Sequence, residues 1–186
     1  PAAWSGKRIE NVRSAQGQVT LSMWLNGDAG RKVGVRAIQQ FGSGGSASVT
    51  TEAGLIDCPT TPTFVQITFT IPSTAGKAVG ANSSLYLVID LCGSGYGGQI
   101  ANQAGAFAIS EIQLESGESA TGFERLPEAV QRVNCQRFCI VDRNGSNGTS
   151  RMNVGPAFFF GSGSAYVTYN FAQQMRAVPA VTISPA

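Results

Sequence analysis

The chain has 186 residues, of which 42% are hydrophobic and 13% are charged, and it contains 23 glycines but no histidine. The composition predicts a globular protein with many turns and excludes helical membrane insertion, because no run approaches the roughly 20 apolar residues that a membrane helix needs. A net charge of only +2 gives no support for nucleic-acid binding, and the lack of histidine excludes Ser–His–Asp catalysis and most zinc sites.

Residues 1–124 show repeated period-two patterns separated by Gly-rich turn signals. In the segment 18–30, apolar Val19, Leu21, Met23 and Leu25 alternate with other residues, as in a half-buried strand. Further segments of strand character are 31–41, 64–73, 83–98 and 105–117. Six or seven such strands predict one domain, an antiparallel β-sandwich of the jelly-roll type.

The stretch 123–140, FERLPEAVQRVNCQRFCI, contains no Gly, Ser or Thr and breaks this pattern. Pro127 suits the first position of a helix and Glu128 complements the helix dipole in the first turn. An apolar stripe at helical spacing consists of Leu126, Ala129, Val130 and Val133. We therefore expect a helix near residues 127–138, within a segment 125–141 that connects two parts of the chain. Phe138 lies off the stripe, so the helix is apolar on more than one side and needs more than one partner surface.

Residues 142–186 read as a turn cluster followed by short strands, including three consecutive aromatics at 158–160. The segment is too short to form a stable core by itself. We expect it to pack on the helix, on the sandwich or on other chains. We also expect both ends of the sequence to continue into a longer protein.

The four cysteines do not form a CxxC pair. Their spacing favours free thiols from a reducing compartment, although a bridge between the first two remains open. They are Cys58, Cys92, Cys135 and Cys139.

Three aromatic residues are candidates for stacking on a sugar. Trp4 and Tyr96 lie in terminal or Gly-rich segments, where loops often carry binding groups. Trp24 lies in a regular strand opposite the apolar face, which favours packing over a ligand platform. For Trp4 and Tyr96, ordinary packing of a loop aromatic is the competing interpretation.

Two glutamates four residues apart in one strand segment, Glu111 and Glu115, are predicted to share a face. Paired carboxylates occur in glycoside hydrolases. Solvated surface charges are the simpler interpretation, and a structural calcium ion bound with the help of Asp90 is a third. We expect no catalytic site, and the sequence leaves the presence of a metal undecided.

Several motifs together resemble the distal modules of bacteriophage tail fibre and receptor-binding proteins. The matching stretches include KRIENVRSAQGQVTLSMWLNGDAG and QQFGSGGSASV, and the resemblance extends over nearly the whole chain. In that family a jelly roll similar to carbohydrate-binding modules ends in Thr-x-Phe-Glu-Arg-x-Pro, and a helix ending in Cys-Gln-Arg-aromatic follows. The corresponding residues are Thr121, Phe123, Glu124, Arg125 and Pro127, then Cys135, Gln136, Arg137 and Phe138.

The resemblance implies a non-enzymatic virion protein, made in the host cytoplasm and carried on a tail fibre or other external appendage. It implies a homotrimer that contacts other virion proteins and binds host-surface glycans. The sequence departs from the family at Cys139, where a second aromatic is frequent, and it shows no clear row of sugar-binding aromatics. The alternative is a carbohydrate-binding module of a secreted glycan-degrading enzyme, which would carry disulfides more often and would not need such a helix.

We expect the helix segment to form the trimer interface, because closed symmetric assembly is the usual way to cover such a surface. Arg132 and Arg137 are predicted to pair with carboxylates of a neighbouring chain, where a guanidinium can bind bidentately. The expected interface residues are Glu124, Arg125, Glu128, Arg132, Arg137 and Phe138.

Overall fold

The computed structural model describes residues 3–140, together with 157–159, 165–167, 170–171, 173–175, 178 and 180. The chain forms two compact units, Pro1–Glu124 and Arg125–Ala186.

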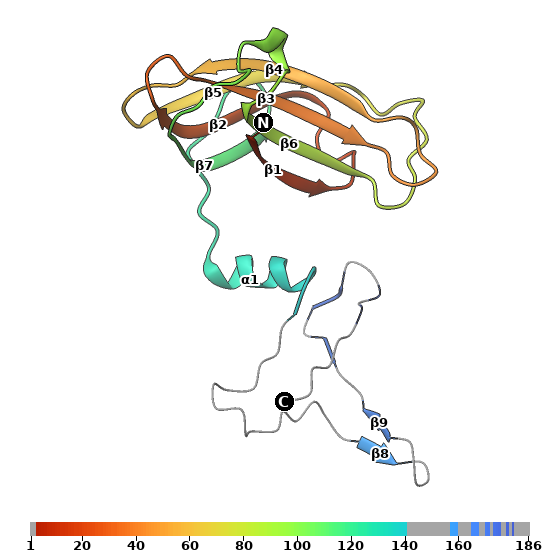
Figure 1. Ribbon diagram of the computed structural model, residues 1–186. Helices are drawn as coiled ribbons and strands as arrows, with labels where there is room; N and C mark the ends of the chain where they lie inside the picture. Colours follow the sequence, from red (N-terminus) through yellow and green to blue (C-terminus); the bar gives the residue numbers. More distant parts are fainter. Residues whose placement is uncertain are drawn as a thin grey trace. The chain divides into compact units, whose positions relative to one another are not determined.

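The first unit consists of two antiparallel sheets that face each other (Figure 1). Sheet A has the strand order β1 (Ala3–Glu10), β6 (Ser84–Cys92), β3 (Lys32–Gln40) and β4 (Val49–Asp57). Sheet B has the order β5 (Thr63–Ile71), β2 (Gly17–Gly27) and β7 (Phe107–Ser116). Every connection between consecutive strands passes from one sheet to the other, except the β3–β4 hairpin. The prediction of an antiparallel β-sandwich is confirmed, while the jelly-roll connectivity stays a prediction.

The core lies between the sheets and uses the apolar residues that the period-two patterns predicted. One buried cluster includes Val19 and Leu21 of β2 and Leu85 and Leu87 of β6. A second includes Met23 and Leu25, packed with Val33, Cys58 and Ile89. Because side chains alternate along a strand, the residues between these positions point to the outer faces of the sheets.

The segment after β7 covers part of the outer face of sheet B. Thr20 is fully buried there. Its hydroxyl donates to the carbonyl of Gly117 at 2.8 Å and lies 2.9 Å from the hydroxyl of Thr68, so the buried polar group is hydrogen-bonded. The backbone N–H of Ala120 donates to Gln66 Oε1, and that of Glu124 donates to Gln113 Oε1. The chain therefore leaves the sandwich along sheet B, bound to its outward-facing polar side chains.

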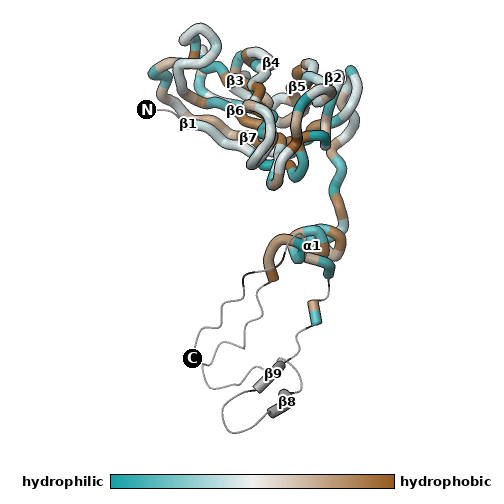
Figure 2. The backbone as a smooth tube through the Cα atoms, turned by 90° about the vertical axis from the view of Figure 1, so that its right-hand side faces the viewer, coloured by the Kyte–Doolittle hydropathy of each residue, from teal (hydrophilic) through white to brown (hydrophobic). Residues whose placement is uncertain are grey.

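In the second unit, α1 spans Glu128–Gln136, so the helix expected near 127–138 is present. Pro127 has an extended backbone conformation and precedes the first helical residue, and Arg137 ends the helix. No residue of α1 is buried. Figure 2 shows hydrophilic and hydrophobic residues interspersed along it.

The described part of the segment after residue 141 includes two short strands, β8 (Ala157–Phe159) and β9 (Ala165–Val167), which pair antiparallel. How the rest of 142–186 packs, and the side chains of the three aromatics at 158–160, lie outside the described residues. Among the described residues, no helix is long and apolar enough to cross a membrane.

Candidate functional site

The outer face of sheet A brings together two of the candidate residues. Trp4 of β1 lies opposite Asp90 of β6, and Asp90 lies opposite Gly34 of β3. The next residues along β6 and β3, Ile89 and Val33, point into the core. Trp4, Asp90 and Gly34 therefore share the outer face, in a row across three neighbouring strands.

Trp4 presents its ring on this face. Its side chain is 60% exposed, although it belongs to a regular strand. Gly6 lies beneath the indole: a Cβ at that position would lie 3.2 Å from Cζ3 of Trp4 and 3.0 Å from the carbonyl oxygen of Leu87. The missing side chain lets the indole rest against the strand while most of the ring stays open. A supported, exposed aromatic ring is a suitable platform for the apolar face of a sugar.

Tyr96 does not present such a ring. It begins the short 3-10 helix η1 (Tyr96–Gly98), is 8% exposed, and lies over Gly34, where a Cβ would come within 2.2 Å of Cε2 of the ring. Its hydroxyl donates to Asp90 Oδ2 at 3.2 Å. Its φ of 55° lies in the left-handed region, which non-glycine residues rarely adopt. The sequence left open whether Tyr96 binds a ligand or packs as an ordinary loop aromatic, and in the structure Tyr96 is a covered residue that packs over Gly34.

Asp90 is the centre of a charged network under this cover. Arg36 Nη2 donates to Asp90 Oδ1 at 2.9 Å, and Arg36 Nε lies 2.8 Å from Oδ2. Burial of the Tyr96 hydroxyl, together with the negative charge of Asp90, raises the pKa of Tyr96. The hydroxyl therefore keeps its proton and remains a donor to Asp90 at physiological pH. These contacts fix the positions of Arg36 and η1 beside Trp4.

A second cation lies further along β1 on the same outer face. Arg8 lies opposite Tyr86, with its guanidinium carbon 5.7 Å from the centroid of the tyrosine ring. Arg8 Nη2 donates to the carbonyl of Asn82 at 3.0 Å. Stacking and hydrogen bonding hold this guanidinium on the sheet. The outer face of sheet A thus offers one open aromatic ring and two fixed arginines, which suit a polar ligand with hydroxyl or acidic groups.

Trp24 lies on the other side of the molecule, on the outer face of sheet B. It is 41% exposed and contacts the ring of Phe64 edge-to-face, with 6.0 Å between centroids and an interplanar angle of 65°. The partial cover of Trp24 by a neighbouring strand agrees with packing as its main role. Trp24 and Trp4 cannot contact one small ligand, because they lie on outer faces of opposite sheets.

The carboxylates suggested for a calcium ion are divided between the two sheets. Asp90 belongs to sheet A and Glu115 to sheet B, and Glu111 has a positive φ of 50° beside an irregularity in the β2–β7 register. Glu115 accepts hydrogen bonds from the hydroxyl of Thr121 at 2.6 Å and from its backbone N–H at 2.9 Å, and these bonds lower the pKa of Glu115. Within the described residues no three acidic or cysteine side chains cluster as metal ligands.

Five of the residues expected at the trimer interface lie in or close to the exposed helix α1 of the second unit, and Glu124 ends the first unit. Arg132 Nη2 lies 3.3 Å from Oε1 of Glu128, one turn earlier in the same helix. Phe138 is 57% exposed just beyond the helix. The apolar stripe is exposed at all four of its positions, which are Leu126, Ala129, Val130 and Val133. The unit as described leaves this stripe uncovered.

Sequence reasoning considered Asp90 only as a calcium ligand and missed its pairing with Arg36 on the outer face of sheet A. The available signal was a charged residue between apolar residues in each of the two strands. Gly34 carries no signal in the local pattern, because the ring that requires it belongs to Tyr96, 62 positions later in the chain. Gly6 is required by the ring of Trp4, two positions earlier on the same strand.

The chain matches no protein-family model, and it matches no curated protein.

Proposed function

We propose that this chain is a non-enzymatic attachment protein of a bacteriophage particle, of the tail fibre or receptor-binding type, that binds glycans of the host surface. The observation that carries the proposal is Trp4, an indole 60% exposed on a regular strand and supported by Gly6. An aromatic ring held open in this way has no use in the core, and sugar stacking is a chemistry that needs it.

The neighbouring groups support the same assignment. Arg36 is held by Asp90, and Arg8 is held by Tyr86 and by the carbonyl of Asn82. Their guanidinium groups supply hydrogen-bond donors at fixed positions on the same face as Trp4. The exposed apolar stripe of α1 favours an attachment protein over a secreted binding module, because a monomeric module has no need of such a surface.

A glycan-array screen with the purified full chain tests the binding. Replacing Trp4 with alanine should weaken binding of the recognised glycan by about 2 kcal/mol or more, which is about thirtyfold in Kd. Trp24→Ala is the matched control, since it removes a half-exposed tryptophan from the outer face of the other sheet. Loss of binding in the Trp24 variant with retention in the Trp4 variant would contradict the assignment of the face.

We propose further that the segment 124–138 joins three copies of the chain. The stripe of Leu126, Val130 and Val133 would face the partner helices, and Arg132 and Arg137 would meet carboxylates of a neighbour at Glu124 or Glu128. Three weak sites on one trimer raise avidity without any strong site.

Light scattering on the full chain tests the assembly. A trimer has a mass of about 58 kDa, three times the chain mass of 19.4 kDa. Val130→Asp should shift the mass towards that of the monomer, because it buries a charge at the interface. Gln131→Asp, on the adjacent helix position, should leave the mass unchanged. A monomer of the unmodified chain at micromolar concentration would rule out the trimer.

A further inference from the structure

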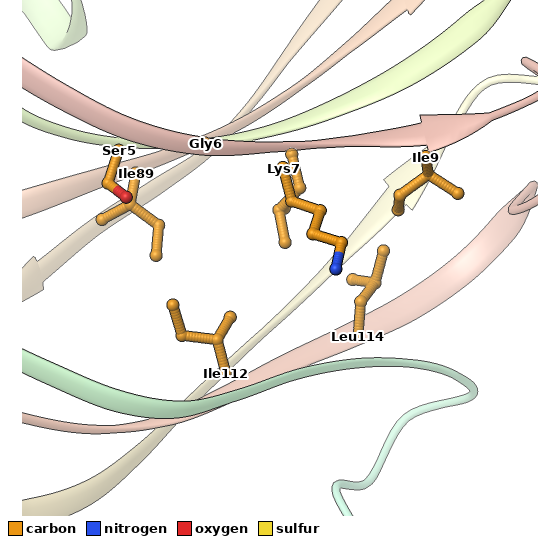
Figure 3. Close-up of a pocket in the computed structure, with 8 residues that line it drawn as sticks. Ser5, Gly6, Lys7, Ile9, Ile89, Ile112 and Leu114 are labelled. Carbon is orange, nitrogen blue, oxygen red and sulfur yellow. The ribbon is translucent and has the colours of Figure 1, made fainter. Parts of the chain in front are cut away.

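The sandwich is open along one side, between β1 of sheet A and β7 of sheet B. A cavity of about 440 Å³ lies there. Its walls include Ile9 of β1, Leu87 and Ile89 of β6, and Ile112 and Leu114 of β7 (Figure 3). We call this cavity the β1–β7 groove.

The groove exists because β1 and β7 are both edge strands on the same side of the sandwich. On the opposite side, β4 and β5 approach closely: a Cβ at Gly54 would lie 3.3 Å from Cδ1 of Ile67. No comparable closure covers Ile112, which remains 42% exposed at the groove. The described part of the chain therefore leaves aliphatic surface from both sheets accessible to a ligand.

Lys7 supplies the charge of the groove. Its side chain extends from β1 into the cavity beside Leu114 (Figure 3). Among the described residues, its ammonium group has no ion-pair or hydrogen-bond partner, whereas Lys32 is paired with Asp57. The groove thus combines apolar walls with one cation that lacks a counter-ion.

We propose that the β1–β7 groove binds a medium-chain fatty acid anion, with the alkyl chain between Ile112 and Ile89 and the carboxylate at Lys7. The walls suit an alkyl chain better than a sugar, because they carry no aromatic ring and few polar groups. The groove follows β1 from Ser5 to Ile9, which is about 13 Å at the usual rise per strand residue. A chain of about ten carbon atoms spans that length, given a carbon–carbon bond of about 1.5 Å in a zigzag. This site is separate from the proposed glycan face, so either can fail without the other.

Titration with sodium decanoate, followed by isoleucine methyl NMR of the full chain below the critical micelle concentration, locates the ligand. The methyl signals of Ile9, Ile89 and Ile112 should shift together, and those of Ile38, on the outer face of sheet A, should not. Lengthening the acid from eight to ten carbons should tighten Kd by up to about fifteenfold, since each buried CH₂ contributes about 0.8 kcal/mol. The gain should stop once the chain exceeds the groove.

Two pairs of variants separate the parts of the site. Ile112→Ser should weaken decanoate binding about fivefold or more, while Phe64→Ser, an equally exposed apolar residue on β5, should not. Lys7→Gln should weaken decanoate binding about two- to fivefold and leave decyl maltoside unaffected, with Lys77→Gln as the charge-matched control.

Three results would overturn the proposal. One is the absence of methyl shifts with decanoate. Another is equal binding of decyltrimethylammonium, which would remove the role of Lys7. The third is a shift of the same methyl signals with protein concentration and no ligand, which would assign the groove to a second copy of the chain.

Discussion

Replacing Gly34 with alanine tests whether Tyr96 supports the outer face of sheet A. The added Cβ would lie 2.2, 2.5 and 2.8 Å from Cε2, Cζ and Cδ2 of the Tyr96 ring. The ring would have to move by about 1.2 Å to restore an ordinary contact of 3.4 Å. Such a movement pulls the hydroxyl away from Asp90, to which it now donates at 3.2 Å.

Overpacking of this kind typically lowers the free energy of unfolding by about 1–3 kcal/mol. With a urea m-value of about 2 kcal/mol/M, the unfolding midpoint should fall by about 0.5–1.5 M. Tryptophan fluorescence is a suitable signal, because Trp4 and Trp24, the two tryptophans of the chain, both belong to the sandwich. Gly93→Ala is the matched control, since a Cβ there meets nothing within 4 Å, and it should leave the midpoint within a few tenths of a molar.

The double variant decides whether the cost arises at Tyr96. In a Tyr96→Ala background the ring is gone, so Gly34→Ala should cost little further stability. The difference between the two backgrounds measures the coupling between the two positions. An equal loss in both backgrounds would refute the steric argument and would place the cost elsewhere in β3.

The other predictions concern thiols, a surface carboxylate and the buried ion pair. The exposed Cys135 and Cys139 should react quickly with a thiol reagent, and the buried Cys58 and Cys92 should react only after unfolding. At Cys58, burial and the charge of Asp57 also raise the pKa of the thiol. Thr121→Val should raise the pKa of Glu115 towards its ordinary range, measured by NMR titration. Since the folded pKa of Glu115 is lowered, its stabilising effect is present above the unfolded pKa and lost as pH falls through the folded value, and the variant should lessen that acid dependence. Arg36→Met should lower the unfolding free energy by about 1–3 kcal/mol, because it leaves the buried Asp90 carboxylate without its cation, while the partial exposure of Arg36 lessens the effect, and an unchanged unfolding free energy would contradict this.

The sequence predicts the sandwich well where one face of a strand is buried and the other is not. In β2 the alternation of Val19, Leu21, Met23 and Leu25 corresponds to the core. It predicts β1 poorly, because no residue of this edge strand is buried. In β4 the pattern is interrupted at Gly54, whose φ of 138° accompanies a register shift against β3. The two strands that the period-two pattern did not predict, β1 and β4, are therefore the edge strands of sheet A.

The candidate site was predictable only in part, for a similar reason. Trp4 and Tyr96 look alike in the sequence, as single aromatics near small residues. Their exposure differs because Tyr96 lies over Gly34, a residue 62 positions earlier in the chain. Local composition shows only that an aromatic residue belongs to a loop. Whether its ring can pack against the sheet depends on a glycine in another strand. Long-range contacts of this kind have no local sequence signal.

The two outer faces of the sandwich differ in whether a segment of the chain is bound over them. On sheet B, the side chains of Thr20, Gln66 and Gln113 bind the backbone of the segment that follows β7. A ligand on that part of sheet B would have to displace this segment and break those hydrogen bonds. On sheet A, the Trp4 ring faces solvent and needs no displacement. A glycan on sheet A would therefore displace less of the chain, so under the proposed function the Trp4 variant should lose binding and the Trp24 variant should keep it.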